Sequence, residues 1–153
     1  MTGFQTIACR AKPVTTNRLQ TINFFDEFEP NNTLDNANPV SLPVVSSDKS
    51  AAFEIEGNVS GANDDSDFFV FTPPRSDLYL VYLCEETCSE HPVDDEVYLM
   101  VYDQSQTTIA STPIGGESEK FLGVELSAGL AYYVEINAYN IAGDYDYKLV
   151  VID

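Results

Sequence analysis

The sequence predicts an all-β fold, an antiparallel sandwich or barrel of about eight strands in a single domain. Three observations lead to this prediction. The 153 residues match the size of one ordinary domain. Nine Tyr and nine Phe supply an aromatic content of 12%, which favours strands over helices. Short apolar segments recur at roughly ten-residue spacing between turn signals, and none has the period and length of a helix.

The first 50 residues differ from the rest of the chain. Residues 1–23 carry three of the seven basic residues and are rich in Thr and Asn, so they are expected to be a tail, a linker or an added edge strand. Residues 24–50 contain three prolines among many Asn, Ser and Asp, which predicts an ordered loop wrapped on the body. The sandwich domain is therefore placed at residues 24–153.

The strands are expected from residue 51 onward. Their predicted ranges are 52–59, 68–72, 77–83, 97–102, 107–111, 121–126, 132–139 and 144–152. The first alternates apolar and polar residues, which is typical of a half-buried strand. The third has apolar side chains on both faces, which indicates a central strand. Turns rich in Gly, Asn, Asp, Pro and Ser separate the strands.

The chain is strongly acidic, with 25 acidic residues, 7 basic residues and a net charge of −18. Nucleic-acid binding is excluded because phosphate contacts need clustered Lys and Arg. Binding to an anionic membrane surface meets the same objection. No stretch is long and apolar enough to span a bilayer. The simplest interpretation of the charge is a solvated surface that keeps the protein soluble, and we expect a monomer.

Three cysteines are present. Zinc binding is not expected, because zinc needs about four ligands and the chain has a single His and one cysteine pair. A local disulfide between Cys84 and Cys88 is predicted if the protein is exported. Two free thiols are the alternative for a cytosolic protein. Cys9 is then free or buried.

Two oxygen-rich segments form the candidate metal site. The segments are residues 27–33 and 63–67. Their carboxylates and amides are the ligands of a hard cation such as calcium. Glu27 and Glu29 lie two apart, so an extended backbone directs both to one side. Asp64 and Asp67 come from a turn before a core strand, which is a rigid support. The alternative is that the glutamates are solvated linker charges and the aspartates form a turn.

Signals for catalysis are weak, and the chain is predicted not to be an enzyme. His91 is the only His, and it is expected to be an exposed loop residue. The sequence has no Gly-x-Ser-x-Gly elbow and no His-Glu-x-x-His motif. Pairs of carboxylates could act as in glycosidases, but such pairs arise by chance in so acidic a chain. A small carboxylate-dependent glycoside hydrolase is therefore a secondary alternative.

Five short motifs occur in order along most of the chain. They are Glu-Phe-Glu-Pro-Asn-Asn-Thr at 27–33, Asp-Ser-Asp-Phe-Phe-Val-Phe at 65–71, an acidic lead-in and strand at 94–103, Tyr-Tyr-Val-Glu-Ile at 132–136, and a closing strand at 143–151. Together they resemble the bacterial pre-peptidase C-terminal domain, a family that includes the collagen-binding domains of clostridial collagenases. The resemblance implies a jelly-roll-like β-sandwich.

The resemblance also implies a calcium site and a cellular context. The ligands that it implies fall on Glu27, Glu29, Asn31, Asn32, Asp64 and Asp67. Relatives commonly have Asp where this chain has Asn32, so the affinity for calcium is expected to be lower. The family's members are attached to secreted peptidases and other exported hydrolases. A bacterial protein that is secreted, extracellular or periplasmic is therefore expected, with a neighbouring peptidase domain as a partner.

The expected function is that of a non-catalytic accessory or binding module stabilised by Ca²⁺. An extracellular protein or polysaccharide polymer is a candidate ligand. Tyr79, Tyr139 and Tyr145 are candidates for a stacking platform, against the alternative that they pack within the sheets. A purely structural surface or adhesin domain, in which the acidic residues serve solubility alone, is the other alternative.

Overall fold

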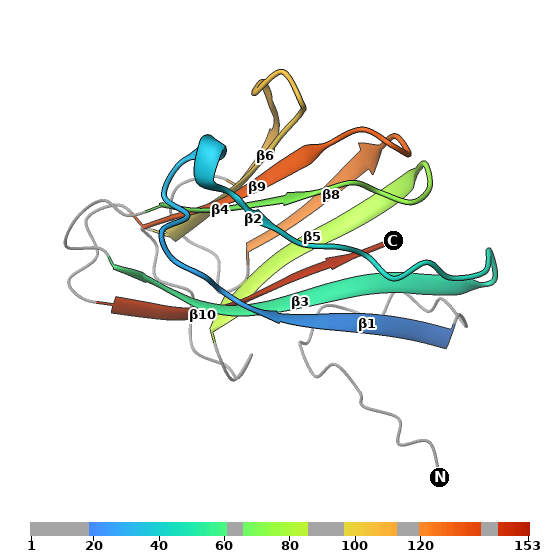
Figure 1. Ribbon diagram of the computed structural model, residues 1–153, viewed down its shortest axis with the longest axis horizontal. Coiled ribbons are helices and arrows are strands. Elements are labelled where there is room, and N and C mark those ends of the chain that lie inside the picture. Colours follow the sequence, from blue (N-terminus) through green and yellow to red (C-terminus); the bar gives the residue numbers. More distant parts are fainter. Residues whose placement is uncertain (1–18, 61–65, 86–96, 113–119, 139–143) are drawn as a thin grey trace, which may run out of the picture.

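The chain folds into two stacked β-sheets (Figure 1). The computed structural model describes residues 19–60, 66–85, 97–112, 120–138 and 144–153. The strands described are β1 (Leu19–Asp26), β2 (Asn38–Pro39), β3 (Lys49–Ser60), β4 (Ser66–Phe71), β5 (Asp77–Glu85), β6 (Val97–Tyr102), β7 (Thr108–Ser111), β8 (Lys120–Leu126), β9 (Tyr132–Ala138) and β10 (Asp144–Ile152). The predicted all-β sandwich is thus confirmed.

Each sheet has five strands, and the strand orders are β1-β3-β10-β5-β8 and β2-β4-β9-β6-β7. The eight predicted strands correspond to β3 to β10, and these pair with one another in antiparallel fashion. As predicted, β5 is flanked on both sides, by β10 and β8. The additional strands β1 and β2 pair in parallel with β3 and β4.

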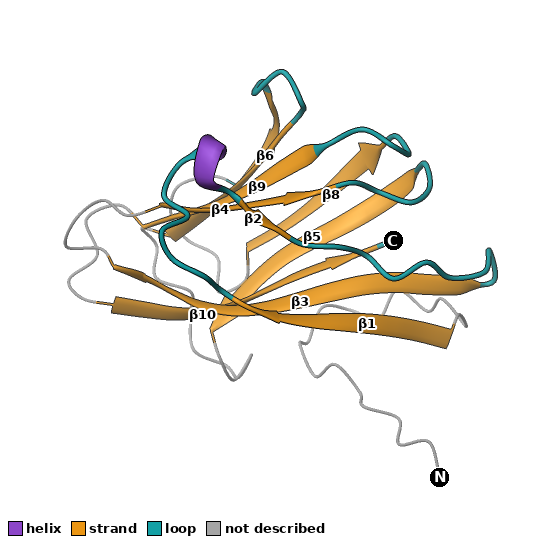
Figure 2. Cartoon of the chain, viewed as in Figure 1, coloured by secondary structure: helices purple, strands orange, loops and turns teal. Residues whose placement is uncertain are grey.

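The sheet begins earlier than the sequence predicts. Strand β1 pairs with β3 over its whole length, from Leu19 to Asp26. The predicted boundary at residue 24 therefore cuts through a strand. A helical 3-10 turn, η1 (Leu34–Asn36), lies between β1 and β2 and is the purple element in Figure 2. The segment from β1 to β2 carries the chain from the edge of one sheet to the edge of the other.

Aromatic and branched side chains fill the space between the sheets. Phe53 and Phe71 meet edge to face, with ring centroids 5.3 Å apart. Tyr79 is fully buried, and its hydroxyl donates a hydrogen bond to the carbonyl of Arg75 at 3.0 Å. Tyr145 is also buried in this core. Both tyrosines therefore stabilise the interior, and the predicted stacking platform is wrong for them.

Two further predictions fall partly or wholly on residues outside the described ranges. Tyr139 lies outside them, so its predicted role stays untested. Cys84 is disulfide-bonded, and the partner cysteine lies outside the described residues, as does the predicted partner Cys88. No helix in the described part of the chain is long and apolar enough to cross a membrane.

Candidate metal centre

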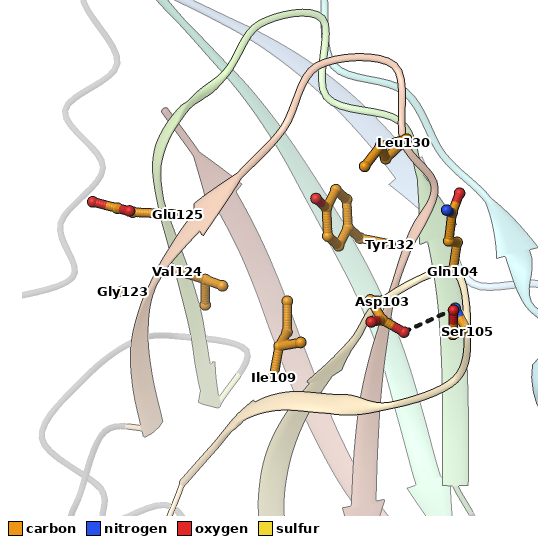
Figure 3. Close-up of a pocket in the computed structure, with 9 residues that line it drawn as sticks. All are labelled: Asp103, Gln104, Ser105, Ile109, Gly123, Val124, Glu125, Leu130 and Tyr132. Atoms are coloured by element: carbon orange, nitrogen blue, oxygen red, sulfur yellow. Dashed lines mark hydrogen bonds between the residues drawn. The ribbon is translucent and has the colours of Figure 1, made fainter.

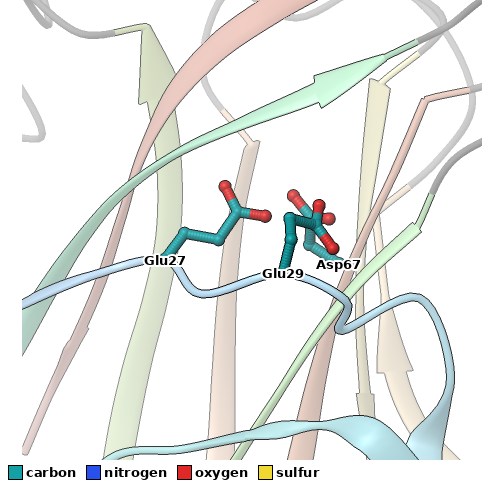
Figure 4. A group of neighbouring side chains, drawn as sticks. All are labelled: Glu27, Glu29 and Asp67. Atoms are coloured by element: carbon teal, nitrogen blue, oxygen red, sulfur yellow. The ribbon is translucent and has the colours of Figure 1, made fainter.

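Three carboxylates gather where β1 leaves its sheet and β4 begins (Figure 4). Glu27 and Glu29 lie in the segment that follows β1, and Asp67 is the second residue of β4. One oxygen from each carboxylate lies within 4.8 Å of the others. We call Glu27, Glu29 and Asp67 the acidic cluster. The predicted meeting of the two oxygen-rich segments is seen in these three residues.

Hydrogen bonds hold Glu27 in place from both sides. Its backbone N–H donates to the carbonyl of Glu56 at 3.0 Å, which continues the pairing with β3. The backbone N–H of Asn58 donates to Glu27 Oε2 at 2.7 Å. The side-chain amide of Asn31 donates to Glu27 Oε1 at 3.2 Å. The carboxylate is therefore fixed at the edge of the sheet that contains β3.

The segment after Glu27 is also fixed. Asn38 accepts a hydrogen bond from the N–H of Phe28 at 2.8 Å and donates one to its carbonyl at 2.7 Å. The N–H of Asn31 donates to Glu29 Oε2 at 2.9 Å. The N–H of Phe68 donates to the carbonyl of Asn31 at 3.0 Å, which connects the segment to β4. Both sheets thus contribute to positioning the acidic cluster.

Two oxygen atoms in this region are buried without a hydrogen-bond partner. They are Asn31 Oδ1 and Asp67 Oδ1, and both residues are fully buried. The other oxygen of Asp67 accepts a hydrogen bond from the hydroxyl of Tyr147 at 2.7 Å. Each unpaired buried acceptor costs about 1–3 kcal/mol. Such atoms are rare in native proteins, and an ion or a water molecule is a common partner for them. A proton on Asp67 would instead let this side chain bond to Glu27.

Burial opposes the ionisation of the cluster. It raises the pKa of Asp67 from 3.8 to about 9, and the hydrogen bond from Tyr147 only partly offsets this, while the charge of Glu27 adds to it. Burial also raises the pKa of Glu27, against the lowering effect of the hydrogen bond from Asn58. A bound cation would favour the charged forms and remove this penalty.

Gly57 leaves room for the cluster. A Cβ atom at this position would overlap Glu27 Oε2 and the hydroxyl of Tyr147. Gly57 and Tyr147 are directly opposite each other in the β3–β10 ladder. The glycine is therefore required by close approach of two side chains.

The structure brings together four of the six predicted ligands. Glu27, Glu29, Asn31 and Asp67 converge, whereas the side chain of Asn32 is exposed. Asp64 lies outside the described residues. The three carboxylates form a hard donor set of a kind that suits calcium, and Asn31 faces Glu27 through its amide nitrogen. The contributions of Tyr147 and Asn38 were not predicted, although a glycine in an otherwise regular strand is a signal of close approach.

Comparison with known proteins gives support for the fold. No family model matches the chain, and no curated protein matches it. Among solved structures, the pre-peptidase C-terminal domain of a collagenase from Bacillus anthracis is similar, with 18% identity and a TM-score of 0.53 over 75% of this chain and 93% of that chain. This likeness concerns the fold and agrees with the predicted sandwich.

Two other solved structures are more distant. One is a periplasmic inhibitor of g-type lysozyme from Aeromonas hydrophila, with 12% identity and a TM-score of 0.46 over 76% of this chain and 99% of that chain. The other is a mitogen from Yersinia pseudotuberculosis, with 15% identity and a TM-score of 0.44 over 65% of this chain and 83% of that chain.

Proposed function

We propose that this protein is a non-catalytic accessory or binding module of an exported protein, stabilised by calcium at the acidic cluster. One observation carries the proposal. The unpaired buried oxygens of Asn31 and Asp67 lie in the region where the carboxylates of Glu27 and Glu29 converge. An oxygen-liganded cation satisfies these atoms and balances the charge at the same time.

Calcium would link the two sheets by binding residues from both. Glu27 and Glu29 belong to the segment that continues from β1, and Asp67 belongs to β4 in the other sheet. When bound, the ion supplies charge neutralisation. Glu27, Glu29, Asn31 and Asp67 supply the oxygens, and the hydrogen bonds from Asn58 and Tyr147 orient two of the carboxylates. Binding energy is then gained only by the folded chain.

The same residues do not favour a hydrolase. Asp67 and Asn31 are fully buried, so a polymeric substrate does not reach them. A structural role of the cluster accounts for this burial.

The exported context is proposed from three observations. The fold is similar to that of a pre-peptidase C-terminal domain from a collagenase. Cys84 is disulfide-bonded, which is typical of oxidising compartments. The strongly acidic composition suits a soluble module. We propose a bacterial secreted or periplasmic monomer that acts beside a peptidase or other hydrolase and adheres to an extracellular protein or polysaccharide polymer.

Calorimetry of the protein stripped with EDTA tests the calcium site directly. Titration with calcium chloride is expected to show binding to one site, and calcium is expected to raise the melting temperature. The double variant Glu29→Gln with Asp67→Asn should lose both effects. The variant Asp35→Asn, an exposed carboxylate in η1, is the matched control and should retain them. Absence of binding heat and of a thermal shift in the wild type would contradict the metal site and leave the purely structural alternative.

A further inference from the structure

The edge of the sandwich opposite the acidic cluster contains a groove. The sheets end there in β7 and β8, whereas they end in β1 and β2 at the cluster. The groove is an open cavity of about 450 Å³ between these edge strands, the turn after β6 and the loop before β9 (Figure 3). We call it the edge groove.

The edge groove has aliphatic residues and one carboxylate in its lining. Ile109 and Leu130 line it, and each is 40% exposed. Asp103 supplies a carboxylate to the groove, whereas the side chain of Glu125 points away from it (Figure 3), and no basic residue is among those that line it. The surface therefore suits a group with an apolar stem and a positive end.

The carboxylate of Asp103 is held in a defined position. Its Oδ1 accepts hydrogen bonds from the backbone N–H groups of Ser105 at 2.8 Å and Thr107 at 3.0 Å. The turn therefore presents a fixed negative charge to the groove. A side chain fixed in this way loses less entropy when it binds a ligand.

The strands that flank the groove have free edges. Within the described part of the chain, β8 pairs only with β5 and β7 only with β6. An unpaired strand edge offers backbone donors and acceptors to an extended peptide. Backbone pairing would fix the direction of such a peptide, and alternate side chains would enter the groove.

We propose that the edge groove binds an extended peptide segment of a partner protein that carries a lysine or arginine side chain. The aliphatic stem of that side chain packs on Ile109 and Leu130, and its charged end pairs with Asp103. This inference names the partner class for the binding role proposed above and rests on that role.

Other occupants fit the groove less well. A second copy would bring another net charge of −18, and an anionic polymer would be repelled in the same way. A neutral sugar would require an exposed aromatic ring for stacking. The ring that lines the groove belongs to Tyr132, which is only 6% exposed and whose hydroxyl accepts a hydrogen bond from the N–H of Ser127.

Titration followed by NMR tests the proposal on the full chain in saturating calcium. The probe is a synthetic peptide, acetyl-Gly-Val-Lys-Val-Arg-Val-Gly-amide. The control peptide has Glu in place of Lys and Arg. The first peptide is expected to shift the methyl signals of Ile109 and Leu130, and the control peptide is not. The variant Asp103→Asn keeps the turn acceptor and removes the charge. It is expected to weaken binding by up to about fivefold, from one exposed ion pair.

The matched control variant is Asp35→Asn, which removes one exposed carboxylate at the opposite edge and should bind the peptide as the wild type does. The proposal is overturned if the lysine peptide produces no shifts at millimolar concentration, if the glutamate peptide binds equally, or if the groove variant binds like the wild type. Shifts at the groove that depend on protein concentration alone would also overturn it, because the occupant is then a second copy. Calcium binding is measured separately by calorimetry, so either result stands without the other.

Discussion

Replacing Asp67 with asparagine should stabilise the ion-free protein at neutral pH and reduce the stabilisation that calcium provides. Asparagine keeps the size of the side chain and an oxygen that can accept the hydrogen bond from Tyr147, but it carries no charge. Because burial raises the pKa of Asp67 to about 9, the folded ion-free protein holds a proton on it at neutral pH. The unfolded chain does not, since its pKa is close to 3.8.

The size of the effect follows from this difference. The pKa of Asp67 is higher in the folded protein than in the unfolded chain, so the fold favours the protonated carboxyl. The stability that this provides is fully present below about pH 4 and is lost as the pH rises toward 9. At about pH 7, roughly 4 kcal/mol of ion-free stability has been lost, at about 1.36 kcal/mol for each pH unit. The D67N variant avoids this loss. It should therefore be more stable than the ion-free wild type at neutral pH and similar to it near pH 4.

Calcium should narrow this difference. A ligand at about 100 times its Kd stabilises the folded state by about 2.7 kcal/mol, which offsets most of the roughly 4 kcal/mol. The D67N variant lacks one of the three carboxylates and should gain much less. Thermal melts by circular dichroism at acidic and neutral pH, with EDTA or with calcium, measure both effects, at about 3 °C for each kcal/mol in a chain of this size. Equal calcium shifts in the two proteins, or an ion-free D67N that melts below the wild type at neutral pH, would refute the reasoning.

Three further results are expected. Gly57→Ala should destabilise the fold by about 1–3 kcal/mol and weaken calcium binding, because the added Cβ overlaps Glu27 of the cluster. Thermal melts and calorimetry measure the two effects. Gly123→Ala is the control, because its added Cβ makes only ordinary van der Waals contacts. Calcium affinity measured by calorimetry should rise between about pH 6 and 9, with proton release, because Asp67 must ionise to bind; an affinity independent of pH would count against Asp67 as a ligand. Arg75→Ala should lower the free energy of unfolding in urea by about 3 kcal/mol, because it removes the guanidinium that lies 2.6 Å from the buried carboxylate of Asp153. Arg75→Lys, which keeps the positive charge, is the control and should lower it less.

The local part of the metal centre could be predicted from the sequence. Glu27 and Glu29 lie two apart directly after β1, and the sequence predicts that their side chains point to one side. The chain bends at Glu29, so this alternation does not continue to Asn31 and Asn32. Asn31 is nevertheless buried beside the cluster and Asn32 is exposed, and the prediction that included Asn32 followed the resemblance.

The non-local part could not be predicted in this way. Tyr147 reaches Asp67 only because β10 pairs with β3 in the register that sets it opposite Gly57. A register is determined by the assembled sheet and does not follow from the spacing of residues in one strand. In β5, apolar residues alternate on both faces, so the sequence does not tell which face is inward. Both a surface platform and packing within the sheets therefore stay possible for Tyr79 from the sequence, and in the structure it lies on the buried face.

The two edges of the sandwich differ in how they are closed, and this difference separates their expected roles. At one edge, the segment after β1 crosses to the other sheet and brings the acidic cluster to β4, so a cation there stabilises the contact between the sheets. At the other edge, β7 and β8 line the edge groove. Since no residue of the cluster lines the groove, calcium should raise the unfolding temperature without changing the affinity of a basic peptide for the folded protein. Peptide titrations with calcium and with EDTA, both well below the melting temperature, should therefore give the same Kd; a different Kd would mean that the two edges are coupled through the core.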